Sequence, residues 1–206
     1  MFELTFRRLR IAIALVLVLA QPALAELSPG GVVMVPSECL PYWNPPHSAA
    51  TDWNRMLSLA ACIQDTSVET IEDAAELPAF VDRLAERLLP SLSLYAMAAQ
   101  SGPGPVKLRA VYQIGMAELS LIQRARQSVH TPALRRDLAE LLEPSAIVAM
   151  LAFAAVVHVA TLDPAVAPDA PSKYMVRHAR ELLEQMAPDW GEVTTEGVRL
   201  AEPSTR

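Results

Sequence analysis

Hydrophobic and polar positions follow a helical period from about residue 51 to residue 99. Apolar side chains recur there every three or four residues, the spacing that places them on one face of an α-helix. The pattern predicts one helix over 51–64, begun by a capping threonine or aspartate, and a short acidic helix over 66–75. The stripe from 77 to 99 stays in phase across Pro90, which predicts either one kinked helix or two abutting helices.

The second half of the chain continues the helical pattern. The turn sequence SGPGP precedes a helix that we expect to run over about 105–129 and to be the longest. Its apolar residues fall on two faces, which is typical of a helix packed between two neighbours. Gly115 indicates a close helix crossing there, because glycine lowers helix propensity by about 1 kcal/mol. An amphipathic helix is predicted over 131–144, and a final one covers about 172–187 after a proline-rich linker.

One stretch, SAIVAMLAFAAVVHVATL at 145–162, contains no charged residue. As a helix it rises about 27 Å, close to the roughly 30 Å of a bilayer's hydrocarbon core, so its length does not decide between a protein core and a membrane span. Its six alanines and the acidic flanks at Glu143 and Asp163 disfavour a span. We predict a central helix buried on nearly all faces, with membrane integration of Ser145 to Leu162 as the alternative.

His158 lies within this uncharged stretch. A single histidine in a buried helix is most often a neutral core residue whose ring is hydrogen bonded. The alternatives are a binding or catalytic role, or a pH sensor, because burial disfavours the charged imidazolium. His158 is therefore a candidate binding residue.

The N-terminus has the layout of a secretory signal peptide. Arginines 7, 8 and 10 precede an apolar run from Ile11 to Ala20, and small residues follow up to Ala25. An uncleaved membrane anchor is the alternative, but the run is about ten residues and a span needs roughly 20. We expect cleavage after Ala25 and export to a bacterial periplasm or the exterior.

Between the signal peptide and the first helix, residues 26–50 are rich in proline and aromatic residues, which predicts an extended strap. Cys39 and Cys62 are the two cysteines of an exported chain, so we expect a disulfide between them, with buried free thiols as the alternative. Tyr42 and Trp43 either cover an edge of the core or form a recognition strip. Residues 188–206 carry little periodicity and are expected to be a disordered tail.

The charge and composition of the chain argue against several classes of function. Hydrophobic residues make up 52% of the chain, and its formal net charge of −6 becomes −8 once residues 1–25 are removed. This acidic balance argues against nucleic-acid binding, which requires a surplus of lysine and arginine. The chain has no G-x-S-x-G serine elbow, no H-E-x-x-H pair and no glycine-rich phosphate loop. We therefore expect no cofactor and no metal site.

Weaker constellations remain as candidates for binding or catalysis. His178 and Glu181 are three residues apart on the last predicted helix, so both can reach one ligand, although a surface pair is the simpler interpretation. Carboxylate pairs such as Glu140 with Glu143 are best interpreted as solvated helix faces. Four methionines, which adapt to irregular cavities, are placed to line a space between helices: Met97, Met116, Met150 and Met175.

The sequence thus predicts a single exported all-α domain over 51–187. We expect about six or seven helices in a bundle, or in a short array that resembles tetratricopeptide arrays in architecture only, since no 34-residue period recurs. The sequence predicts many helices and lacks the catalytic motifs named above. The leading hypothesis is therefore a non-enzymatic module that binds a protein partner in the bacterial envelope. A carrier of an apolar ligand or lipid is the alternative, and an enzyme is the third interpretation.

Overall fold

The computed structural model describes residues 37–42, 52–64 and 70–201, the side chains of 188–201 excepted. Within these ranges the chain is all-α, which confirms the predicted fold class. The elements in chain order are η1 (Ser37–Tyr42), α3 (Trp53–Ile63), η2 (Ala74–Glu76), α4 (Leu77–Ser101), α5 (Gly104–Ser128), α6 (Pro132–Leu162), η3 (Pro164–Val166) and α7 (Ala170–Ala201), where η denotes a 3-10 helix.

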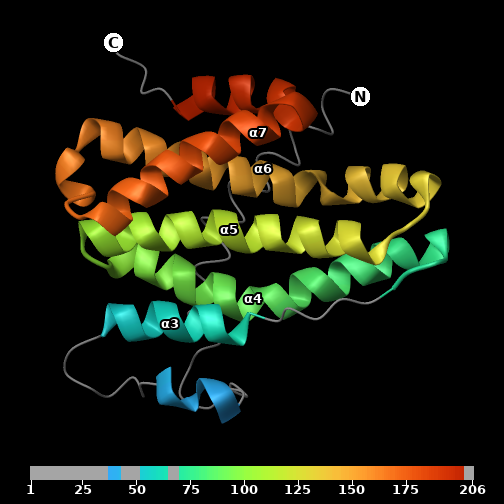
Figure 1. Ribbon diagram of the computed structural model, residues 1–206, viewed down its shortest axis with the longest axis horizontal. Coiled ribbons are helices and arrows are strands. Elements are labelled where there is room, and N and C mark those ends of the chain that lie inside the picture. The colour runs from blue at the N-terminus through green and yellow to red at the C-terminus, as the bar shows by residue number, and fades with distance from the viewer. Residues whose placement is uncertain (1–36, 43–51, 65–69, 202–206) are drawn as a thin grey trace.

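The α-helices form a layered array in which each helix packs on the next one along the chain (Figure 1). Short connections join α4 to α5 and α5 to α6, so these neighbours run antiparallel. The 3-10 helix η1 packs on α3 at one edge of the array, and α7 packs on α6 at the opposite edge. This order decides which segments of the chain can reach which surface.

Helix starts follow the expected capping chemistry. The Asp52 carboxylate accepts a hydrogen bond from the Arg55 amide at 3.1 Å, so Asp52 caps α3. The Thr131 hydroxyl accepts from the Leu134 amide at 3.4 Å and caps α6. Thr51, the other proposed cap of α3, lies outside the described residues.

The predicted acidic helix over 66–75 is wrong where the structure describes it. Residues 70–73 are not helical, and η2 covers only Ala74–Glu76. Ile71 is buried, forms an isolated parallel bridge with Val129 and donates its amide to the Ser128 carbonyl at 3.0 Å. This buried backbone partner at the end of α5 competes successfully with a helical hydrogen bond.

Three expectations about helix length are also wrong. The segments predicted as separate at 131–144 and 145–162 form one 31-residue helix, α6, with Pro144 inside it. This helix and the 32-residue α7 are both longer than the 25-residue α5. The helix of α7 continues to Ala201, past the expected end at Ala187. Proline removes a single amide donor, so a helix held by its neighbours can continue through it.

Pro90 likewise lies inside the continuous helix α4, so this stripe forms one helix and not two abutting helices. Leu77, Leu84 and Leu88 are buried along it as predicted. Two hydroxyl groups on the same helix, those of Ser91 and Tyr95, are fully buried and have no hydrogen-bond partner among the residues that the structure describes. Burial raises the pKa of the Tyr95 phenol to about 12, with the Arg109 charge opposing the shift, so this phenol stays neutral.

Gly115 marks a close crossing of α5 and α6, as predicted. A β-carbon at this position would lie 2.6 Å from Cε1 of Phe153, which is itself fully buried. The glycine therefore provides the space that the Phe153 ring fills.

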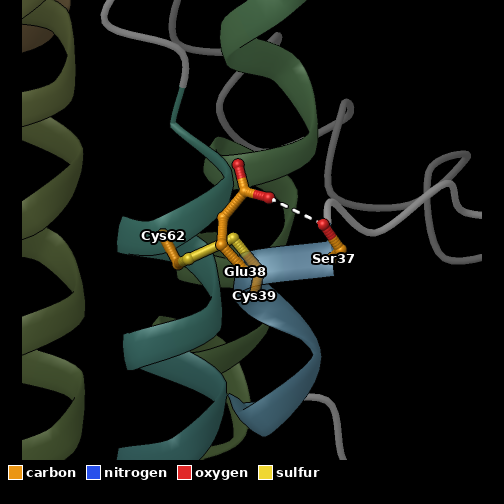
Figure 2. Close-up of a disulfide and its surroundings, with 4 residues drawn as sticks. All are labelled: Ser37, Glu38, Cys39 and Cys62. Carbon is orange, nitrogen blue, oxygen red and sulfur yellow. Dashed lines mark hydrogen bonds between the residues drawn. A yellow bond between two sulfur atoms is a disulfide. The ribbon is translucent and has the colours of Figure 1, made fainter.

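A disulfide joins Cys39 of η1 to Cys62 of α3, which confirms the predicted pairing (Figure 2). The two α-carbons are 5.7 Å apart, within the usual range for such a bridge. A guanidinium nitrogen of Arg55 also donates to the Pro41 carbonyl at 2.7 Å, so this hydrogen bond and the disulfide both hold η1 on α3. The strap is not extended throughout, because Ser37–Tyr42 is a 3-10 helix. Residues 26–36 and 43–50 of the strap lie outside the described residues.

Candidate functional site

The uncharged half of α6 is buried on one side only. Of the 18-residue apolar window of this helix, 33% is buried, so the prediction of a helix buried on nearly all faces is wrong. The buried side includes Ala149, Phe153 and Val156, which pack into the core. Within the described residues, α6 is long and apolar enough to span a membrane by length and composition alone.

The opposite side of this half-helix forms one apolar strip along the surface. We call it the outward face of α6; none of its residues belongs to the buried core cluster. Their spacing of three and four places them on a single helical face. The residues are Ile147, Val148, Leu151, Ala154, Ala155, His158, Val159 and Leu162.

Exposure along the outward face increases toward the end of α6. Val159 is 43% exposed and Leu162 is 72% exposed, whereas Ile147 and Leu151 are half-buried. His158 is exposed, so its interpretation as a core residue is wrong. His158 extends the strip, and a histidine side chain is neutral when it is deprotonated. The sixteen residues from Ile147 to Leu162 therefore include no permanently charged side chain.

His178 lies in a different place, at the junction of α5 and α7. Its Nδ1 atom is 2.6 Å from the hydroxyl oxygen of Tyr112, and its ring stacks on Tyr174 with centroids 5.6 Å apart. Burial raises the pKa of the Tyr112 phenol, and the nearby Tyr174 adds to the shift. When the protonated phenol donates to Nδ1, the neutral imidazole carries its proton on Nε2.

Glu181 forms a surface ion pair with Arg177. Its carboxylate lies 3.8 Å from Nε of Arg177, and both side chains are largely exposed. The Arg177 guanidinium also lies over the Tyr174 ring, 5.6 Å from its centroid. The structure thus places His178 in an aromatic cluster with Tyr112 and Tyr174, and places Glu181 in a surface ion pair.

Glu118 of α5 is a buried carboxyl group that the sequence patterns did not single out. It is 8% exposed and hydrogen bonded to Ser145 of α6. Burial raises its pKa to about 7, and the hydrogen bond from Ser145 opposes the shift. A sequence signal was present, because apolar residues or glycine flank Glu118 at three and four residues on both sides.

The remaining candidates are Tyr42, Trp43 and the four methionines. Tyr42 is exposed on η1, at the edge of the array opposite to α7, and Trp43 lies outside the described residues. Met150 is buried in the core, while Met97, Met116 and Met175 are half-buried. Among the described residues, no group of three or more histidine, cysteine, aspartate or glutamate side chains is arranged to hold a metal ion.

Comparison of the chain with protein-family models, with curated proteins and with solved structures finds no match. The described residues form an all-α helical array in which η1 is linked to α3 by a disulfide and α6 has an apolar outward face.

Proposed function

We propose that this protein is an exported, non-enzymatic interaction module of the bacterial envelope, and that it binds a protein partner through the outward face of α6. The observation that supports the proposal is the position of this strip: sixteen residues of α6 carry no permanent charge, yet their outer side is not buried in the fold. Surface apolar strips of this kind typically mark interaction sites.

The proposed address is the periplasm or the exterior, after cleavage behind Ala25. The Cys39 to Cys62 disulfide supports it, because such bonds persist in oxidising compartments. The signal peptide itself lies outside the described residues. The proposed cleavage rests on the sequence, in which three arginines precede an apolar run.

The carrier and enzyme alternatives gain less support. Met150, one of the four methionines proposed to line a cavity, is 1% exposed and packs within the core cluster. Of the histidines considered for catalysis, His158 is exposed on α6, and His178 forms a hydrogen bond with Tyr112 in the aromatic cluster. These positions favour a protein-binding function over catalysis or ligand transport.

Photo-crosslinking in producing cells tests the proposal. A photo-reactive phenylalanine analogue replaces His158 on the outward face, and the control carries it at Gln127, an exposed residue of α5. We expect a protein adduct of defined mass from position 158 and none from position 127. Adducts at neither position, or lipid adducts at 158, would contradict the proposal.

A further inference from the structure

We infer that η1 is a redox-controlled lid over a second apolar side of α3. Reduction of the Cys39 to Cys62 disulfide by a dithiol releases η1 and exposes Leu59. This inference goes beyond the proposed function, since η1 and α3 lie at the edge of the array opposite to α7 (Figure 1). Three features of these elements lead to it: the two buried sides of α3, the few contacts that hold η1, and the unequal exposure of the two cysteines.

The helix α3 has two buried sides that point in different directions. One side bears Leu57 and Ala60, which belong to the buried core cluster, and this side packs on α4. The other side bears Leu59, which is 5% exposed and yet does not belong to the core cluster. Leu59 is therefore buried by contacts outside the core of the array.

Leu59 lies on the side of α3 that faces η1. Arg55, four residues before it, donates a hydrogen bond to the Pro41 carbonyl of η1 at 2.7 Å. Cys62, three residues after it, forms the disulfide with Cys39 of η1 (Figure 2). Residues spaced by three and four lie on one face of a helix. Among the described elements, η1 is therefore the one that packs on the Leu59 side of α3.

The disulfide is the main link between η1 and α3. Of the six residues of η1, Cys39 is buried and the other five are exposed. Its large apolar side chains, Leu40 and Tyr42, are 55% and 42% exposed. The hydrogen bond from Arg55 is exposed as well, so it contributes little to stability. These contacts are too weak to offset the conformational entropy that six ordered residues lose, and η1 depends on the disulfide to stay in place.

The two sulfur atoms of the disulfide differ in their access to a reductant. Cys39 is fully buried and Cys62 is half-buried, so a thiolate of the dithiol attacks the Cys62 sulfur. The protein disulfide breaks, a mixed disulfide forms at Cys62, and Cys39 leaves as a thiolate. The second thiol of the reductant then displaces Cys62. The dithiol is oxidised to a disulfide, and its two protons end on the two cysteines, which become thiols.

Alkylation of the reduced chain tests the release of η1. The exported, purified chain is reduced with dithiothreitol, separated from the reductant and treated with a maleimide, and peptide mass spectrometry follows Cys39 alone. Release of η1 opens this thiol to solvent, so we expect its rate to lie within about tenfold of the rate in guanidinium chloride. Slowing by more than about tenfold would show that η1 stays on α3 without the disulfide, and would overturn the inference.

Circular dichroism of the same samples separates the release of η1 from unfolding of the array. We expect the reduced chain to keep the helical signal of the oxidised chain. The Cys39→Ser variant cannot form the disulfide and should keep this signal without any reductant. Loss of the helical signal on reduction would overturn the inference, because the disulfide would then hold the whole fold together.

An apolar fluorescent dye, anilinonaphthalene sulfonate, tests which side of α3 is exposed by reduction. We expect the reduced chain to bind more dye than the oxidised chain, and Leu59→Gln to lose most of this increase. Leu89→Gln is the matched control, since Leu89 on α4 is already 45% exposed in the oxidised chain, and it should keep the increase. No increase in the native chain, or an equal increase in both variants, would contradict the inference.

Discussion

The Tyr112 hydroxyl of α5 lies 2.6 Å from Nδ1 of His178 on α7, so two residues 66 positions apart in sequence join these helices. Tyr112 is 7% exposed, and its contact with His178 is part-buried. A hydrogen bond of this kind contributes about 1 kcal/mol to stability.

Tyr112→Phe should lower the free energy of unfolding by about 1–2 kcal/mol, because the imidazole nitrogen loses its partner in a part-buried position. Urea denaturation followed by circular dichroism measures the change. Tyr174→Phe is the control, since Tyr174 is 51% exposed and its hydroxyl reaches solvent. Equal stability of the Tyr112 variant and the native chain would show that the contact contributes nothing.

Glu118 predicts a loss of stability as the pH rises. Its pKa in the folded state is about 7, above the value of 4.5 expected for an unperturbed glutamate, so the folded chain binds more protons between these values. Stability should therefore fall as the pH increases from about 4.5 through 7, by roughly 3 kcal/mol from this group. Denaturation measured between pH 5 and pH 8 tests the slope.

Glu118→Gln removes the ionisation and keeps the shape of the side chain. This variant should be more stable than the native chain at pH 8 and should flatten the dependence on pH. Glu140→Gln, on the exposed side of α6, is the matched control and should retain the slope. A slope that survives Glu118→Gln would assign the effect to another group.

Gly115→Ala should destabilise the fold, although alanine is the better helix former. The gain in helix propensity is about 1 kcal/mol, whereas overpacking against Phe153 costs about 1–3 kcal/mol, so we expect a net loss of about 1 kcal/mol. Adding Phe153→Leu should recover part of this loss in a double-mutant cycle. Stabilisation by Gly115→Ala alone would contradict the close crossing.

The disulfide should stabilise the N-terminal part of the array. The cysteines are 23 residues apart, and the loop-entropy relation assigns about 3 kcal/mol to a loop of this length. Replacing Cys39 and Cys62 together by serine should lower stability by about this amount. Native protein in reductant should match the double variant. Full retention of stability after verified reduction would contradict the prediction.

The sequence predicted the helices and several contacts between them because these depend on local patterns. The cap at Asp52, the close crossing at Gly115 and the Cys39 to Cys62 bridge all follow from spacing or from residue chemistry. Helix boundaries at proline were harder to predict from the sequence. Pro144 marks the end of a predicted segment, yet packing on α5 and α7 keeps α6 continuous.

The spacing of apolar residues could not predict which side of α6 is exposed. A helix without charges satisfies the same pattern whether it is surrounded by two neighbours or by more, and the number of neighbours is a property of the tertiary fold. In this array α6 packs mainly on α5 and α7, which leaves the side bearing Leu151 and His158 outward. Similarly, the contact of Tyr112 with His178 depends on how α7 packs on α5, and no local pattern contains it.

The proposal that a partner covers the outward face of α6 is tested most directly by labelling a single cysteine in place of His158 with a maleimide. The rate is compared in intact producing cells and in dilute purified protein, with Gln127→Cys on α5 as the reference. We predict that position 158 reacts more slowly than position 127 in cells, and that the two rates converge on dilution. Equal rates in cells would contradict the account, because they would show the outward face open to solvent where the protein acts.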